Sequence, residues 1–263
     1  MKHLRLLFPL ALLGACVLFL GLNATAQDDK KAEKPVPIRA LLITGGCCHD
    51  YDTQKGILMA GIAERANVTF DLVYEQFPGK EHEIGIYSRK DWAKDYDVIV
   101  HNECYGGVTN VPFVESIAKA HTDHDVGVVF LHCSMHSYRA AETDAWRKLV
   151  GMTSMNHGKK HPIPVTKVEA NANHPVIAPV PNDWTTPNGE LYNSLKMWDT
   201  ATPLATGTIP STEGAQTCVW LNEYEGCKVF GTTIGHHNET MADPIYLDLV
   251  TRGLLWTVDQ LDP

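Results

Sequence analysis

The stretch Val126–Tyr138, VGVVFLHCSMHSY, decides the fold that the sequence predicts. Its first half is almost wholly apolar, which is typical of a strand buried on both faces of a parallel sheet. The apolar run ends abruptly at His132 and Cys133. Because ligands of open α/β sheets bind beyond the carboxyl ends of the strands, these two side chains stand where a site is expected. The alternative is a structural histidine beside a buried thiol.

Strand and helix patterns alternate on both sides of this stretch. Buried-strand patterns cover Ile38–Gly46, Val68–Glu75 and Tyr96–Val100, and helix patterns cover 52–66, 110–122 and 140–150. This alternation predicts an α/β fold with a doubly wound, mainly parallel sheet and flanking helices.

The last third of the chain adds two further elements. Thr217–Asn222 and Lys228–Ile234 flank the turn residues 223–226, which predicts a β-hairpin. Asp243-Pro244 then opens a final amphipathic helix.

Residues 1–26 have the features of a secretory signal peptide. Lys2 and Arg5 precede a short apolar core, and Ala24-Thr25-Ala26 forms an A-x-A cleavage site. The core is too short to favour stable membrane insertion, so we expect a periplasmic or secreted protein. Cleavage at Cys16, as in a lipoprotein, is the alternative. Residues 27–37 are expected to form a flexible leader, and residues 38–263 a single domain.

The composition restricts the partners of the protein. The chain has 22 Lys and Arg against 31 Asp and Glu, a formal net charge of −9, and no basic stripe. Nucleic acid is therefore not an expected partner. We expect no nucleotide cofactor, and the sequence leaves open whether the chain forms a homo-oligomer.

Three predicted strands lead into histidines. His49 follows the first strand, His132 ends the central strand, and His236 follows the second strand of the hairpin. A parallel sheet would bring these imidazoles to one edge, where a divalent metal ion could bind, zinc being the expected one. Each histidine could instead be structural, and no HExxH or other local metal signature supports the prediction.

Other residues are expected to complete this site. Glu190 follows the long proline-rich segment 156–187, and with His132 it is the expected catalytic group. Asn102 and Glu103, at the end of the third strand, are expected substrate contacts. Tyr192 and Trp184 lie in or beside the long segment and are the aromatic residues expected to contact the substrate, although core packing is the default role of such residues.

An ordered set of short motifs resembles the ThuA-like (trehalose-utilisation) family. The matching pieces include ALLITGG with His49, YDVIVHNE, GVVFLHCS, Glu190-Leu191-Tyr192 and the closing Gly253-Leu254-Leu255-Trp256, and together they cover nearly all of residues 38–263. The resemblance implies the class I glutamine amidotransferase-like fold, a flavodoxin-like three-layer arrangement. It also implies a role in carbohydrate catabolism, particularly with 3-keto-glycosides made from disaccharides. Cys133 departs from the family, in which a small apolar residue is commoner.

Three functions remain open at this stage. The first is a metal-assisted hydrolase or lyase that acts on 3-keto-glycosides or disaccharides. The second is a non-catalytic carbohydrate-binding module. The third is an amidotransferase-like hydrolase that uses Cys133, His237 and Glu239, but the strained turn of such a nucleophile favours glycine two residues to either side. Leu131 and Met135 occupy those positions here.

The cysteines allow one disulfide prediction. Cys47 or Cys48 follows the first strand and Cys104 follows the third, and these two strands lie side by side in the usual order of this fold. We therefore consider a disulfide between them, provided that their Cα atoms come within about 7 Å.

Overall fold

The computed structural model describes Met1 and residues 36–262. The predicted signal peptide and nearly all of the predicted leader lie outside this part of the chain. Among the helices within it, none combines the length and the apolar character needed to cross a bilayer.

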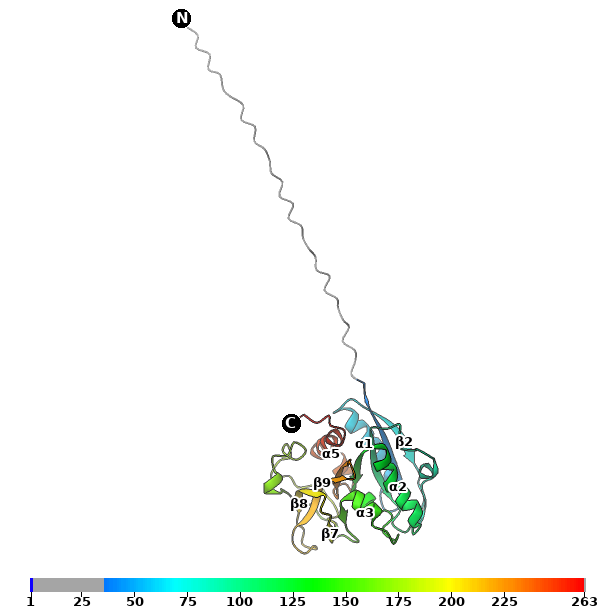
Figure 1. Ribbon diagram of the computed structural model, residues 1–263. Helices are drawn as coiled ribbons and strands as arrows, with labels where there is room; N and C mark the ends of the chain where they lie inside the picture. Colours follow the sequence, from blue (N-terminus) through cyan, green and yellow to red (C-terminus); the bar gives the residue numbers. More distant parts are fainter. Residues whose placement is uncertain (2–35, 263) are drawn as a thin grey trace. The chain divides into compact units, whose positions relative to one another are not determined.

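An eight-stranded sheet forms the middle layer of the domain (Figure 1). Five parallel strands lie in the order β2-β1-β3-β4-β10, and they cover Val68–Tyr74, Ile38–Gly46, Val98–Cys104, Gly127–Leu131 and Cys227–Thr232. Three antiparallel pairings then add β9 (Gln216–Tyr224), β8 (Ala201–Gly207) and β6 (Val165–Lys167). The predicted mainly parallel sheet is confirmed, and β4 lies in its interior, as its apolar sequence requires.

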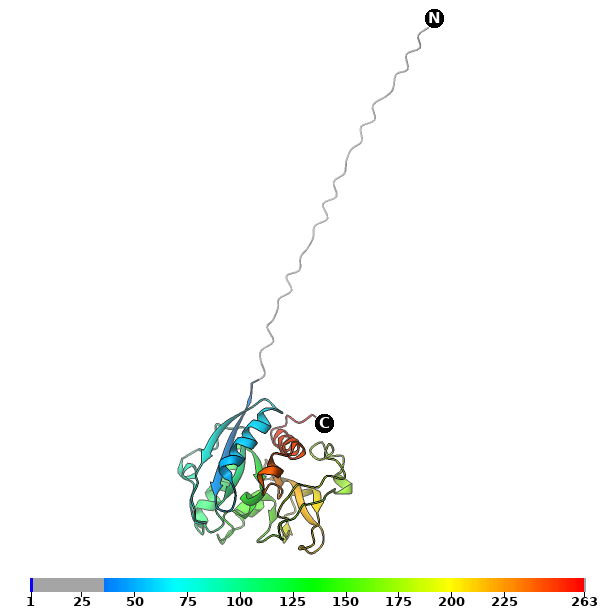
Figure 2. The ribbon, with the colours of Figure 1, turned by 180° about the vertical axis from the view of Figure 1, so that it is seen from behind.

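Helices cover both faces of the sheet. Figure 1 shows α2 (Val111–His124) and α3 (Ala145–Val150) on one face. Figure 2, from behind, shows α1 (Tyr51–Ala63) and α5 (Pro244–Thr257) on the other. Two separate apolar clusters fill the layers, one with Leu58 and Leu249 and one with Ile117 and Trp146. This is the three-layer arrangement that the resemblance implied.

Local signals explain where the main helices begin. Asp50, Asn110 and Asp243 each accept a hydrogen bond from a backbone N–H of the first turn, with proline at the start of α2 and α5. Such caps satisfy amides that have no partner within the helix. The predicted hairpin is also confirmed: Glu225 (φ 49°) and Gly226 (φ 92°) form a two-residue turn between β9 and β10, and positive φ at both positions is typical of a type I′ turn.

The structure corrects several predicted boundaries. β3 does not end at Val100 but continues to Cys104, because β1 offers backbone partners as far as Gly46. The third helix spans 145–150 and not 140–150, because residues 137–140 form a turn, in which Tyr138 has φ 58°, and the bend 141–144 follows it. β8 was not predicted; Pro203 lies at an irregular register there, and proline is disfavoured in regular strands.

Short elements complete the domain. Two strands, β5 (Met152–Thr153) and β7 (Lys196–Met197), pair apart from the main sheet. The remaining helical turns are η1 (Gly85–Ser88), η3 (Glu169–Asn171) and α4 (Asn238–Met241). The carboxyl ends of β1, β3, β4 and β10 meet at one edge of the sheet, and this edge carries the site.

Candidate functional site

Three histidines meet at this edge from distant parts of the chain. His49 lies in the loop after β1, His132 is the first residue after β4, and His236 follows β10. His49 Nε2 lies 2.9 Å from His236 Nδ1, and His132 Nε2 lies 3.2 Å from the same atom. The structure therefore brings together the three imidazoles that the sequence predicted as metal ligands.

Glu190 joins the three histidines from the long segment that precedes it. Its Oε2 atom lies 3.0 Å from His236 Nδ1 and 3.7 Å from His132 Nε2. Each of the four side chains offers one donor atom, and these four atoms all lie within 4.8 Å of one another. We call His49, His132, His236 and Glu190 the histidine cluster.

Hydrogen bonds orient the rings of His132 and His49, and the one made by His132 also fixes its tautomer. His132 Nδ1 donates to the carbonyl of Thr233 at 2.6 Å, which leaves Nε2 of a neutral ring without a proton. His49 Nδ1 lies 2.9 Å from the Tyr51 hydroxyl, which leaves Nε2 of His49 to face His236. One cation between these atoms would contact His49 Nε2, His132 Nε2 and Glu190 Oε2 at once.

The donor set fits a divalent ion such as zinc. Zinc–nitrogen bonds of about 2.0–2.1 Å place tetrahedral ligands roughly 3.4 Å apart, close to the spacings within the cluster. Neutral imidazole and carboxylate are also the donor types that zinc takes.

Burial keeps His49 and His132 in the neutral form that binds metal. Burial, reinforced by the neighbouring His132 and His236, lowers the pKa of His49 to about 2. Burial likewise lowers the pKa of His132. For Glu190, burial favours the protonated form, but hydrogen bonds to His132 and His236 outweigh it and hold its pKa well below the usual range. Near neutral pH the cluster thus presents the neutral rings of His49 and His132 beside an ionised carboxylate.

Aromatic side chains pack around the cluster. The Tyr192 hydroxyl lies 3.2 Å from His132 Nε2, and its ring stacks on His136 with the centroids 4.0 Å apart. His136 is held in turn by the Ser154 hydroxyl at 2.9 Å. Tyr192, which the sequence predicted as a sugar contact, therefore lies at the cluster but contacts it by its hydroxyl.

The turn after β4 is strained at His132. Its φ is 45°, a left-handed value that is rare for residues other than glycine. The neighbouring Cys133 forms a disulfide with Cys104, with Cα atoms 5.4 Å apart. This corrects the predicted pairing of Cys104 with Cys47 or Cys48, both of which are free. Cys104 and Cys133 come together because β3 and β4 are neighbouring parallel strands.

A cavity of about 330 Å³ opens onto the cluster. Glu190, His49, His236 and Tyr192 form part of its wall. The four cysteines Cys47, Cys48, Cys104 and Cys133 line another part, and Lys80, Arg139 and Lys160 add positive charge.

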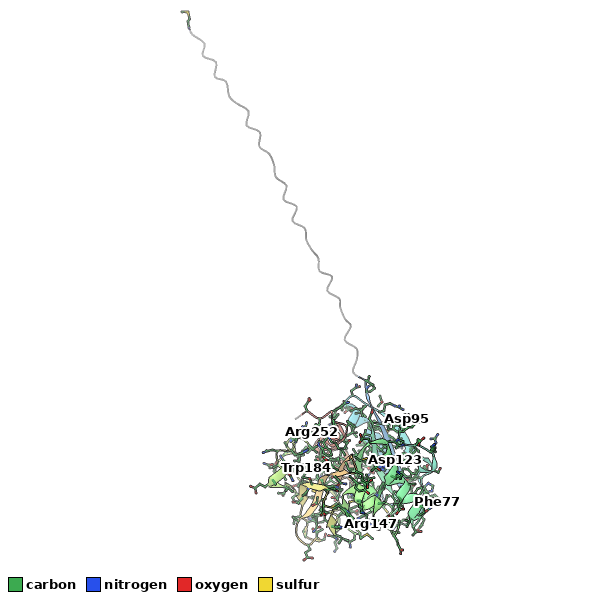
Figure 3. The ribbon with its side chains drawn as sticks, viewed as in Figure 1. Phe77, Asp95, Asp123, Arg147, Trp184 and Arg252 are labelled. Atoms are coloured by element: carbon green, nitrogen blue, oxygen red, sulfur yellow. A yellow bond between two sulfur atoms is a disulfide. The ribbon has the colours of Figure 1, made fainter. Side chains whose placement is uncertain are left out.

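Three predicted substrate contacts do not reach this cavity. Asn102 is buried and donates to the Thr44 hydroxyl. Glu103 is fully buried on the α2 side of the sheet, where His101 and Tyr87 contact its carboxylate. Trp184 donates to Asp243 and packs in the core, and Figure 3 shows it on the same side of the molecule as Arg252 of α5. These placements correct the predictions for all three residues.

The alternative nucleophile set is not assembled either. Cys133 is engaged with Cys104, and the strained residue of the turn is His132. His237 and Glu239 line a separate, shallower hollow next to His236.

His157 was missed as a site residue. Its Nε2 lies 3.4 Å from Glu190 Oε2, and with a side chain 41% exposed it is the part of this group that solvent reaches most easily. Its place in the long segment just before Glu190 was the signal that could have identified it.

Comparisons with known proteins agree with this architecture. A ThuA-like protein from Parabacteroides merdae aligns with a TM-score of 0.67 at 18% identity, covering 85% of this chain and 90% of its own. A ThuA-like protein from Bacteroides uniformis gives 0.61 at 14% identity, with coverages of 84% and 93%.

The glutaminase domain of Trypanosoma brucei CTPS with bound acivicin gives a TM-score of 0.50 at 14% identity, covering 86% of this chain and 95% of its own. At such identities the likeness shows the fold, which is that of class I glutamine amidotransferases. No curated protein matches the sequence. The family model described as ThuA, trehalose utilisation, matches residues 39–257, and the chain therefore belongs to the ThuA family.

Proposed function

We propose that this protein is an exported, metal-assisted hydrolase or lyase that acts on 3-keto-glycosides or related disaccharides. The observation that carries the proposal is the convergence of three imidazoles and one carboxylate on a cavity. The kinship with the trehalose-utilisation family supports a carbohydrate as the substrate.

His49, His132 and His236 would hold the ion, which would supply Lewis acidity toward a ketone oxygen. The tautomer of His132 leaves its Nε2 lone pair free, and the hydrogen bond to Tyr51 orients the ring of His49 so that its Nε2 faces the same point. Such outer partners orient metal ligands in proteins. The chain itself therefore prepares the three nitrogens for coordination.

Glu190 is the group that takes the proton next to the ketone. Its low pKa means that it is ionised and able to accept at neutral pH. The electron pair left on carbon expels the glycosidic oxygen from the next carbon of the ring. His157, 3.4 Å from Glu190 and open to solvent, relays the proton to that oxygen. Later addition of water to the double bond turns this elimination into a net hydrolysis.

The cavity limits the ligand in size and polarity. At about 330 Å³ it lies at the small end of ligand pockets, which favours one sugar unit over a polymer. The Tyr192 hydroxyl at its wall can donate to a sugar oxygen.

The binding-module alternative finds less support. Such modules rely on exposed aromatic faces, yet Trp146, Trp184 and Trp220 are all buried. A hydrolase based on Cys133 would require a free thiol, which the disulfide with Cys104 removes.

Turnover of a synthetic 3-keto-disaccharide tests the proposal, with the wild type compared against Glu190→Gln and His161→Ala. We expect Glu190→Gln to lose at least about 100-fold in rate, as is usual when an acid–base group is removed. His161 lies exposed in the same long segment and serves as the matched control, with an unchanged rate. Binding of the sugar without turnover by the wild type would instead favour the binding module.

A further inference from the structure

The structure places a sulfur cluster beside the histidine cluster. Of the six cysteines in the described residues, Cys218 and Cys227 are buried elsewhere, whereas the other four line the site cavity. The sulfur atoms of Cys47, Cys48 and Cys104 all lie within 4.8 Å of one another. We propose that these three cysteines form a second metal site, selective for a soft ion such as monovalent copper, which becomes available when the Cys104–Cys133 disulfide is reduced.

The spacing of the sulfur atoms suits such an ion. Cys47 Sγ lies 4.0 Å from Cys104 Sγ. Metal–sulfur bonds of about 2.3 Å place ligand sulfurs roughly 3.8 Å apart in a tetrahedral site and about 4.0 Å apart in a trigonal one. Thiolates select soft ions, while the imidazole and carboxylate groups of the histidine cluster suit harder ones. The three cysteines would thus bind a soft ion such as monovalent copper, and the histidine cluster would bind a harder divalent ion.

The backbone is shaped to hold two adjacent cysteines at this point. Gly45 and Gly46 have φ of 133° and 114°, and a side chain on Gly46 would strike the backbone of Cys104. This close approach lets the Cys47 amide donate to the Cys104 carbonyl at 3.4 Å. Cys48 then adopts φ 83°, a strained value for a residue with a side chain. Strain at a cysteine beside two others is expected where a ligand uses that arrangement.

Access and protonation are consistent with uptake from solvent. Cys48 is exposed and Cys47 partly exposed, so an incoming ion can reach both. Thiols bind metals as thiolates, so an incoming ion displaces the proton of each cysteine that it binds. One proton is released for each metal–thiolate bond that forms.

Thiol–disulfide exchange with a dithiol can reduce the Cys104–Cys133 disulfide. A dithiol supplies two electrons and two protons to Cys104 and Cys133, and it leaves as its own disulfide. Cys104 then becomes a ligand, and Cys133 carries a new thiol next to Cys104 and His49. A small-molecule disulfide reverses this exchange: it takes up the two electrons and two protons, leaves as two thiols and closes the site again.

The test titrates the purified full chain with monovalent copper under anaerobic conditions, against a chromophoric chelator. One sample is first reduced with a phosphine, and the other keeps its disulfide. We expect the reduced protein to retain one more copper per chain, with a thiolate-to-copper absorption band. Cys47→Ser and Cys48→Ser should each weaken this copper at least tenfold, and Cys218→Ser is the matched control.

The variant His236→Ala separates the two sites. It removes a ligand of the histidine cluster but none of the three cysteines, so the reduced variant should take up copper as the reduced wild type does. Equal copper retention with and without reduction would overturn the proposal. Copper uptake that is unchanged in both Cys47→Ser and Cys48→Ser would also overturn the proposal, since other residues would then be the copper ligands. Circular dichroism of each variant shows whether the fold is kept, and serine at these two cavity-lining positions changes one atom only.

Discussion

His132 Nε2 lies 3.2 Å from His236 Nδ1, although the two residues are 104 positions apart in the chain. The contact exists because β4 and β10 are adjacent parallel strands, so their carboxyl ends deliver both rings to one place. His49 lies in the loop at the carboxyl end of β1, another parallel strand of the same sheet, and it contacts His236 from there. The site is therefore a product of the sheet order, and its chemistry can be tested one residue at a time.

Two tyrosine variants should separate metal binding from catalysis. Tyr51→Phe removes the partner of His49 Nδ1 and should lower metal affinity about 10- to 100-fold, as is typical when the group that orients a metal ligand is lost. Tyr192→Phe removes a hydroxyl at the cavity wall and should keep the metal but lower kcat/KM about tenfold, the value of one hydrogen bond. Metal titrations and steady-state kinetics on both variants make the comparison. Equal effects on affinity would contradict the assigned roles.

The buried histidines should make the metal-free protein sensitive to acid. Burial lowers the pKa of His49 to about 2, of His136 to about 2 and of His121 to about 3. The unfolded chain binds these protons near pH 6.5, so the free energy of unfolding is greatest above pH 6.5 and falls as the pH drops below it. Each group contributes up to about 1.4 kcal/mol per pH unit.

Urea unfolding of the chelated protein at pH 7.5 and pH 5 measures this dependence. We expect the midpoint to fall at pH 5. Glu190 does not explain such a fall, because its lowered pKa makes its own contribution disappear only under more acidic conditions. A midpoint that stays the same at both pH values would show that these rings are not buried in neutral form.

The disulfide is expected to stabilise the fold without taking part in the reaction. Cys104 and Cys133 are 29 positions apart, and closing a loop of this length contributes about 3.6 kcal/mol by restricting the unfolded chain. The double variant Cys104→Ala/Cys133→Ala should therefore unfold at lower urea but keep most of its turnover. Complete loss of turnover in a variant that is folded and still binds metal would instead support the hypothesis that Cys133 is a nucleophile.

The amino terminus gives a separate prediction. Export with cleavage after Ala26 would leave Gln27 as the first residue of the mature protein. Mass spectrometry of protein expressed in a bacterial host with intact secretion measures the mature mass. A chain that begins at Cys16 with a lipid attached would contradict this prediction and show that the protein is processed as a lipoprotein.

Much of the fold could be predicted because its signals are local. The apolar run 126–131 and the caps Asn110 and Asp243 specify their elements by themselves. The meeting of His49, His132 and His236 was also predictable, since it follows from strand direction alone.

The errors arose where distant partners decide the outcome. Asn102 and Glu103 were expected to face a substrate at the end of the third strand, but pairing with β1 continues β3 through both, and their side chains are buried away from the cavity. Trp184 was expected at the site because it lies in a long loop, and its bond to Asp243 holds it in the core instead. The pairing of Cys104 with Cys133 depends on which residues beyond two adjacent strands face each other, and sequence patterns do not specify this.

The metal content of the purified protein tests the central claim most directly. The wild type, His236→Ala and His161→Ala are loaded with zinc, dialysed and measured by elemental analysis, and the disulfide is kept intact so that the sulfur cluster stays closed. We predict about one zinc per chain in the wild type and in His161→Ala, and loss of that zinc in His236→Ala. Equal zinc in all three proteins, or none in the wild type, would contradict the assignment of His49, His132 and His236 as a metal site.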